Sequence, residues 1–263
     1  MGHGMCVEEQ DTITGQLRNK INKNYGVLNL SMWGNGPLLY YATLREYIKY
    51  AKPEKVFWFH SEGNDFSDLE TEKKSDILMK YYNNENYSQN LANKQNQIDD
   101  LVMKLIRQNE IKGQNSGFYQ KNLSFKIISF IKLRKIRKLI FKEQKRLKVN
   151  SLDNIDMYKK IIIKSKILTE KNGGKFYFVD IPDIYSRIYT QQKNLLFKEK
   201  QDLTREMKAF INKEKINYIE IYNNLLNSNP DLLKLFPFDG QLGGHFNPKG
   251  YSEVSRIIFD SIK

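Results

Sequence analysis

The chain has 263 residues, of which 40% are hydrophobic and 13% aromatic, enough for a sizeable core in one domain with an insertion. A single cysteine, Cys6, excludes an intrachain disulfide, and no His-x-x-x-His motif or calcium-type Asp-rich loop occurs, so we expect no metal and no cofactor. No run of 18 apolar residues is present, which argues against a membrane-spanning helix.

The first predicted elements are a short strand at 27–30 and a helix at 38–50. They are joined by Ser31-Met32-Trp33-Gly34-Asn35-Gly36-Pro37. The glycines permit a tight turn with exposed backbone N–H groups, which can hold an anionic oxygen. The backbone N–H groups of this turn are therefore candidates for binding such an oxygen.

A second strand is predicted at 55–60, where Val56-Phe57-Trp58-Phe59 forms an apolar run. The run ends in the polar residues Glu62-Gly63-Asn64-Asp65. Ligands of open α/β sheets bind at the carboxyl ends of the strands, so this cluster is a candidate site. His60 is interpreted first as a structural residue in the wall of that site.

The middle of the chain, residues 71–172, predicts a helical insertion with helices at 76–82 and 98–106. Of the formal net charge of +13, most lies at 101–150, which holds 14 Lys and Arg against two acids. Residues 125–148 mix apolar and cationic side chains, which predicts a helix with one apolar and one cationic side.

Residues 125–148 allow three interpretations. The helix could cover the pocket with solvated lysines, or it could lie on an anionic membrane surface and bring the site to lipid-linked substrate. Nucleic-acid binding is the third, but basic charge alone gives salt-sensitive, unspecific affinity, so no specific nucleic acid is predicted.

The C-terminal part predicts strands at 175–181 and 216–221, with helices at 190–213 and 253–262. Alternation of strand and helix favours a parallel sheet with right-handed crossovers. His245 lies in a Gly-rich segment before the last helix. Its imidazole is suited to proton transfer near neutral pH.

Three of these segments resemble sequence blocks of the SGNH hydrolases, also called GDSL esterases and lipases. The Gly34 segment resembles the block whose glycine N–H lines the oxyanion hole, and Glu62-Gly63-Asn64-Asp65 resembles the Gly-x-Asn-Asp block, whose asparagine amide donates to the same oxyanion. Gly244-His245 with Gly250-Tyr251 resembles the block that carries the general base. The likeness covers about 1–75 and 175–263, with the blocks in family order.

The resemblance implies a flavodoxin-like three-layer α/β sandwich with a parallel sheet of order 2-1-3-4-5. It divides the chain into a first part of the α/β domain at 1–70, a basic helical insertion at 71–172 and a second part at 173–263.

The chain departs from the family at its first block, Gly-Asp-Ser followed by three residues and a glycine. Residues 1–12 resemble only the tail of that block. If Gly4 is the block glycine, the nucleophilic serine is expected immediately before Met1, and the first strand of the sheet is missing as well. Two expectations stay open: a start that falls after the serine, or a protein without the nucleophile.

A second departure concerns the acid that orients the histidine. The family has aspartate three residues before it, where this chain has Leu242, and the nearest acid is Asp239. Either Asp239 orients the imidazole, or a backbone carbonyl does so and the site is a Ser–His dyad.

The expected function is hydrolysis of an ester (O-acyl) bond in a glycan, lipid or small metabolite by Ser–His covalent catalysis. Two alternatives stay open: a catalytically inactive module that binds acylated glycan or scaffolds a membrane assembly, and an O-acyltransferase that uses the same residues. The expected location is cytoplasmic, or peripheral at the inner membrane.

Overall fold

The computed structural model describes residues 4, 7–21, 25–32, 34–116, 151–184, 187, 195–237 and 245–263. The helices are α1 (Ile13–Lys20), α2 (Pro37–Ala51), α3 (Asp65–Glu72), α4 (Asp76–Asn83), α5 (Gln95–Ser116), α8 (Ser151–Lys171), α10 (Leu195–Lys213), α11 (Tyr222–Ser228) and α12 (Pro248–Asp260). Short 3-10 helices occur at Glu9–Asp11, Ala92–Lys94 and Leu232–Leu235. The strands are β1 (Lys55–Ser61), β2 (Lys175–Ile181) and β3 (Asn217–Glu220).

The three strands form a parallel sheet in the order β1-β2-β3. In its register Trp58 lies opposite Phe178, and His60 lies opposite Asp180. Parallel neighbours need a crossover connection, and helices supply both crossovers here. The strands predicted at 55–60, 175–181 and 216–221 and the parallel arrangement are confirmed.

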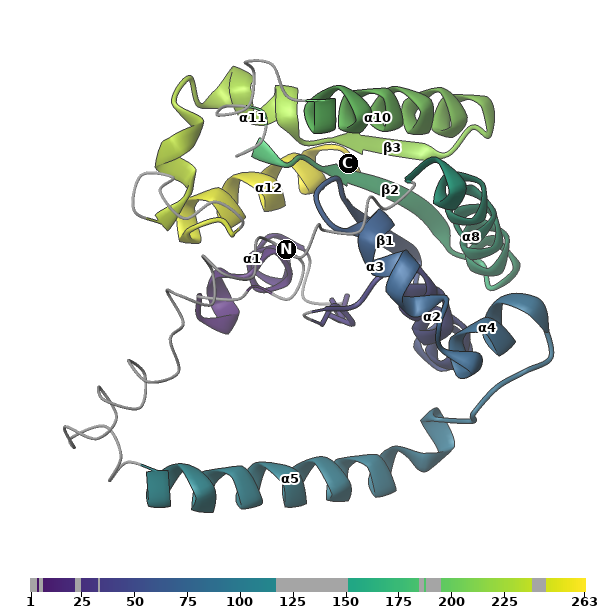
Figure 1. The fold of residues 1–263 in the computed structure, drawn as a ribbon. Coiled ribbons are helices and arrows are strands. Elements are labelled where there is room, and N and C mark those ends of the chain that lie inside the picture. Colours follow the sequence, from purple (N-terminus) through teal and green to yellow (C-terminus); the bar gives the residue numbers. More distant parts are fainter. Residues whose placement is uncertain are drawn as a thin grey trace, which may run out of the picture. The chain divides into compact units, whose positions relative to one another are not determined.

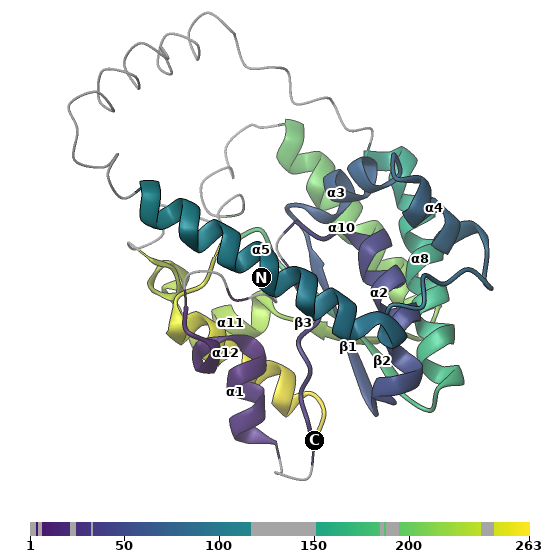
Figure 2. The ribbon, with the colours of Figure 1, turned by 90° about the horizontal axis from the view of Figure 1, so that it is seen from below.

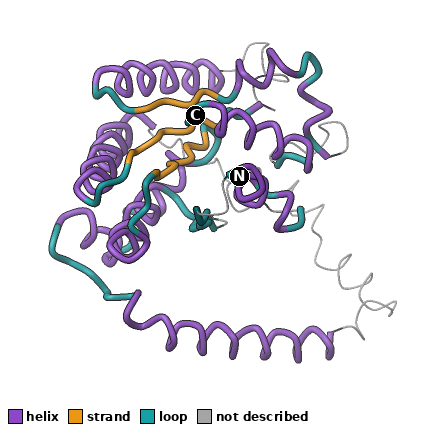
Figure 3. The backbone as a smooth tube through the Cα atoms, turned by 180° about the vertical axis from the view of Figure 1, so that it is seen from behind, coloured by secondary structure: helices purple, strands orange, loops and turns teal. Residues whose placement is uncertain are grey.

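Helices cover both faces of the sheet, so the described α/β unit has three layers (Figures 1 and 3). Alternate strand residues point to opposite faces and enter two separate cores. Val179, Ile181 and Ile219 pack with α1, α11 and α12, whereas Phe176 and Phe178 pack with α2, α3, α8 and α10. The mixed α/β class and the layering therefore agree with the prediction.

The strand predicted at 27–30 does not form. The side chains of Leu28 and Leu30 are 64% and 42% exposed, although Val27 packs against the core. An extended apolar run becomes a strand only when its backbone groups pair with a neighbour. Among the described residues the sheet consists of β1, β2 and β3, and the 27–30 run pairs with none of them.

The insertion is shorter than predicted. Residues 1–87 and 150–263 form one compact unit, and residues 88–149 form a second. Figure 2 shows α8 and α4 beside α2 in the first unit. The predicted boundaries at 71 and 172 were wrong because α4 buries Tyr81 and α8 buries Tyr158 and Ile161, all at most 1% exposed.

In the second unit, α5 confirms the helix predicted at 98–106. The basic helix predicted at 125–148 lies outside the described residues. None of the helices in the described ranges combines the length and the apolar character that crossing a membrane requires.

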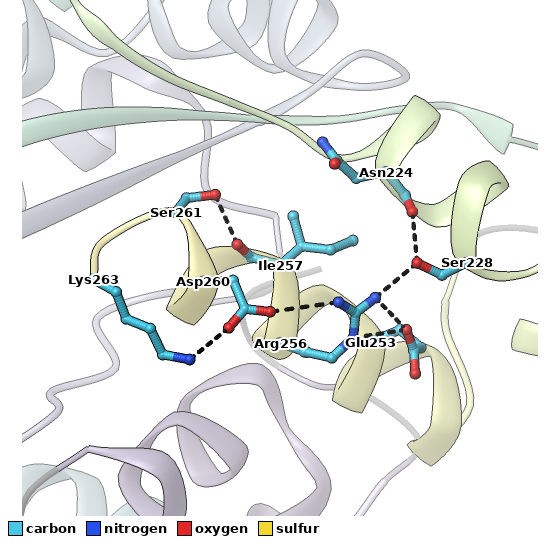
Figure 4. Close-up of polar contacts among 8 residues, drawn as sticks. All are labelled: Asn224, Ser228, Glu253, Arg256, Ile257, Asp260, Ser261 and Lys263. Atoms are coloured by element: carbon cyan, nitrogen blue, oxygen red, sulfur yellow. Dashed lines mark hydrogen bonds and ion pairs between the residues drawn. The ribbon is translucent and has the colours of Figure 1, made fainter.

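The C-terminal helix is fixed to its neighbour through polar side chains (Figure 4). Arg256 on α12 donates to the Ser228 hydroxyl on α11 and to Glu253 Oε2, each at 2.8 Å. Its other terminal nitrogen lies 3.4 Å from Asp260. These contacts, together with the apolar face of α12, set the direction in which this helix leaves His245.

Candidate functional site

The Gly34 segment forms an exposed turn before α2. Gly34 has φ of 79°, a left-handed conformation that favours glycine, and no atom lies within 4 Å of where a Cβ would stand. Its N–H group makes no hydrogen bond with any described residue, whereas the next amide, Asn35 N–H, donates to the Met32 carbonyl at 3.3 Å. Within the described residues, the Gly34 N–H thus stays a candidate donor.

Asn64 lies in the tight turn between β1 and α3. Its backbone N–H donates to the Ser61 carbonyl at 3.1 Å, and its own carbonyl accepts from Ser67 and Asp68 at 2.9 Å each. The backbone is thus fixed, but the exposed side-chain amide makes no hydrogen bond within the described part of the chain. Among the described residues, nothing occupies the carboxamide, which stays a candidate ligand donor.

Helix α3 connects these two turns. Its Glu72 accepts hydrogen bonds from the backbone N–H groups of Gly36 at 2.7 Å and Leu38 at 2.8 Å. Glycine is required at 36, because a Cβ there would lie 2.7 Å from Asp68 Cβ and 2.8 Å from Glu72 Oε2. The Gly34 turn therefore packs directly on the helix that begins after Asn64.

Glu62, in the same polar cluster as Asn64, forms hydrogen bonds with other residues of the protein. Its carboxylate accepts from Arg187 Nε and Nη2 at 3.0 Å each, from Thr204 Oγ1 at 2.7 Å and from Asp183 N at 2.8 Å. Burial alone would raise the pKa of Glu62, but these donors and the charge of Arg187 outweigh it and lower the pKa. Glu62 joins the ends of β1 and β2 rather than facing a substrate.

His60 lies in the interior, which agrees with the structural interpretation. Its Nδ1 is 3.1 Å from Asp65 Oδ2 and 2.8 Å from the Tyr158 hydroxyl, and that hydroxyl donates to Asp65 at 3.0 Å. Burial lowers the pKa of His60, yet the hydrogen bond and charge of Asp65 bring it above the ordinary value. The network binds β1, α3 and α8 together.

His245 is half-buried just before α12. Its backbone position is set by its neighbours: Phe246 is fully buried against Phe236, with ring centroids 4.9 Å apart, and Asn247 caps the helix by accepting from Gly250 N–H at 2.9 Å. Burial lowers the pKa of His245 below its ordinary value. The imidazole is therefore neutral at pH 7, as a general base requires.

The Nδ1 atom of His245 is buried and has no hydrogen-bond partner among the described residues. Asp239, the predicted orienting acid, lies outside them, as does Leu242. Neither of the two predicted ways of orienting the ring is therefore decided by the described contacts.

The N-terminal candidate glycine is held close to α1. Gly4 has φ of 71°, and a Cβ on it would lie 2.3 Å from Thr12 Cγ2. Thr12 caps α1 by accepting from Gly15 N–H at 3.0 Å, and α1 packs on α12. The segment that contains Gly4 is thus connected to the helix that follows His245.

The structure joins the predicted residues in two groups, Gly34 with Asn64 through α3, and Gly4 with His245 through α1 and α12. No hydrogen bond between described residues connects Gly34 or Asn64 with His245. Sequence reasoning missed Glu72. One signal was available, because α2 begins with Gly36-Pro37, which offers no capping side chain and calls for an acceptor from elsewhere.

Comparisons of the chain with protein families, with curated proteins and with solved structures give no significant match.

Proposed function

We propose that this protein is an SGNH-type hydrolase that cleaves an ester (O-acyl) bond. The observation that carries the proposal is the attachment of the Gly34 turn to α3 through Glu72. Glu72 binds the backbone two and four residues after Gly34 and lies on the helix that begins after Asn64, which supports a shared role for the Gly34 N–H and the Asn64 carboxamide. Fixed donors of this kind stabilise the oxyanion of a tetrahedral intermediate.

In the proposed reaction a serine on the N-terminal side of Gly4 attacks the ester carbonyl carbon, while neutral His245 accepts the serine proton. The carbonyl oxygen becomes an oxyanion that accepts hydrogen bonds from Gly34 N–H and the Asn64 amide. The carbon–oxygen bond to the alcohol then breaks, and His245 returns the proton to the leaving alcohol. Water, deprotonated by His245, hydrolyses the acyl-enzyme.

The substrate class is a small acyl ester, an acylated glycan or an acylated lipid. An anionic membrane surface contacted by residues 125–148 would favour the lipid. Transfer of the acyl group to a sugar would use the same residues, because the two reactions differ only in whether water or an alcohol attacks the acyl-enzyme.

A binding module for acylated ligands is the second candidate. It would use the same Gly34 and Asn64 donors, and it needs no orienting partner for the buried Nδ1 of His245. A histidine without an orienting partner is a weaker base. The hydrolase and the binding module would use the same oxyanion donors, but only the hydrolase would cleave the ester.

The test uses hydrolysis of p-nitrophenyl butanoate by the chain extended with a strand-forming segment that ends in Gly-Asp-Ser. We expect Asn64→Ala to lower kcat by about 10²–10³-fold, since one oxyanion donor is lost, and His245→Ala to lower it at least as much. Asn227→Ala, an exposed asparagine on α11, is the matched control and should leave kcat unchanged. Full activity in both site variants would refute the proposal.

Binding of butanoate, the acid product, separates the two candidates. In an NMR titration of the unextended chain, butanoate should shift the resonances of the Gly34 N–H and the Asn64 side-chain amide in either case. Binding without hydrolysis by the serine-extended chain would favour the binding module.

A further inference from the structure

The N-terminus of α2 is capped by a side chain from far away in the sequence. Glu72 Oε1 accepts from Gly36 N–H at 2.7 Å and from Leu39 N–H at 3.4 Å, while Oε2 accepts from Leu38 N–H at 2.8 Å. Pro37, at the first helical position, has no N–H group to satisfy. One carboxylate therefore satisfies three of the free donors of this helix end.

The carboxylate is also well placed electrostatically. The N-terminus of a helix carries a partial positive charge, which a buried anion complements. Glu72 is 8% exposed, so water screens this interaction little. The contact holds backbone rather than side-chain atoms, and so it determines the path of the chain just after Gly34.

We propose that Glu72 is the positioning residue of the oxyanion-binding turn. It holds the backbone at Gly36 and Leu38, just after Gly34, against the helix that follows Asn64 and so limits the spacing of the two donors. This inference rests on the proposed function. Donors stabilise an oxyanion only when they lie within about 0.5 Å of the productive geometry, which explains why one buried carboxylate is used for this contact.

Burial raises the pKa of Glu72 to about 7, more than the three N–H donors lower it, and the charge of Asp68 adds to the rise. The groups that share this environment are Asp68 and Asp65 on α3 and Tyr40 on α2. The carboxylate gains its full charge, and its strongest hold on the three amides, only above neutral pH.

The first readout is amide hydrogen exchange, which does not depend on activity. In Glu72→Gln, the side-chain NH₂ group cannot accept, so we expect exchange at Gly36, Leu38 and Leu39 to become about tenfold faster or more. Glu70→Gln on the same helix is the control and should leave these amides unchanged, because Glu70 contacts Lys73 and Asn154 instead. Unchanged exchange in Glu72→Gln would overturn the proposal.

The second readout is butanoate titration of the Gly34 N–H and the Asn64 amide. We expect Glu72→Gln to weaken binding about tenfold and, in the serine-extended chain, to lower kcat with little change in KM. Faster exchange with unchanged butanoate affinity and kcat would overturn the positioning role. If the unchanged protein neither binds butanoate nor hydrolyses the ester, the proposed function fails, while the exchange result still decides whether Glu72 holds the turn.

A third measurement needs no variant and covers the case in which Glu72→Gln does not fold. In the unchanged protein, the amide proton shifts of Gly36 and Leu38 should follow the ionisation of Glu72 near pH 7. Shifts that follow the ionisation of no carboxyl group between pH 3 and pH 9 would overturn the proposal.

Discussion

Glu62 illustrates how a polar residue at a strand end can serve the fold instead of the substrate. Its carboxylate receives hydrogen bonds from the Arg187 guanidinium and the Asp183 backbone amide, which follow β2, and from the Thr204 hydroxyl on α10. Its side chain is 7% exposed and that of Arg187 is 19% exposed, so the charges are weakly screened. Removing one partner leaves the other charge buried without compensation.

We therefore expect Glu62→Gln to reduce the free energy of unfolding by about 3 kcal/mol at pH 7, measured by urea denaturation followed by circular dichroism. The pKa of Glu62 is lowered in the folded state, so its stabilisation is present above pH 4.5 and is lost as the pH falls through the folded pKa. The difference between the two proteins should shrink below pH 4.5. Asp202→Asn, which breaks an exposed pair with Arg205, should change stability by less than about 0.5 kcal/mol. Equal effects of the two substitutions would contradict this account.

For single residues, the sequence predicted where the turns lie better than it predicted what their side chains contact. Strand-end logic predicted exposed donors at Gly34 and Asn64, because turn chemistry depends on adjacent residues. The roles of Glu62 and Glu72 depend on Arg187 and Gly36, which are 125 and 36 residues away in the chain. Local patterns contain no information on such partners.

Among the elements, α4 and the chain that follows it are held by one arginine of α2. Arg45 donates to four backbone carbonyls, those of Tyr81 at 2.6 Å, Asn84 at 2.9 Å, Glu85 at 2.5 Å and Tyr87 at 2.7 Å. These groups include the C-terminal end of α4, where carbonyls lack helical partners. The contact ends at Tyr87, the last residue before the second compact unit.

Arg45→Lys keeps the charge but loses the planar fork that reaches four acceptors. We expect a loss of about 1–3 kcal/mol in the free energy of unfolding and faster amide exchange at residues 84–90. Arg205→Lys, at an arginine that is 77% exposed, serves as the control and should alter neither quantity. Slow exchange at 84–90 in Arg45→Lys would mean that other contacts hold this segment.

The elements themselves were predicted where apolar periodicity was strong, as in α2, β1, β2 and α12. The exception was 27–30, where Leu28 and Leu30 have strand propensity but remain exposed. Strand propensity is a property of one segment, whereas a strand forms only when two segments pair through backbone hydrogen bonds. The propensity of the 27–30 run therefore did not suffice to predict its pairing.

At the scale of the molecule, residues 71–172 were predicted as an insertion, and both ends of this segment belong to the compact unit that contains the sheet. The polar, Lys-rich composition of 71–172 suggested a separate helical region. Composition averages over a segment, but burial is decided residue by residue: Tyr81 and Tyr158 anchor α4 and α8 in the first unit. The site therefore rests on a larger scaffold than predicted.

Three groups of that scaffold bind protons more tightly in the folded state than in the unfolded chain. Burial raises the pKa of Glu72 to about 7 and that of Asp68 to about 6, while Asp65 keeps the pKa of His60 above its ordinary value. For each of them the unfolded state releases its proton first as the pH rises, so stability falls with pH in the windows from 4.5 to 7, from 3.8 to 6 and above 6.5. His245, with a lowered pKa, has the opposite sign.

The net expectation is a protein that is more stable at pH 5 than at pH 8, by about 3–6 °C in Tm, because three groups outweigh one. Thermal unfolding across this range, followed by circular dichroism at constant ionic strength, measures it. The double variant Asp68→Asn, Glu72→Gln removes two of the three groups and should flatten the profile, whereas Asp202→Asn should leave its slope unchanged. A Tm that rises from pH 5 to pH 8 in the unchanged protein would show that these carboxyl groups ionise in the folded state as freely as in the unfolded chain, and hence that α3 does not bury them as described.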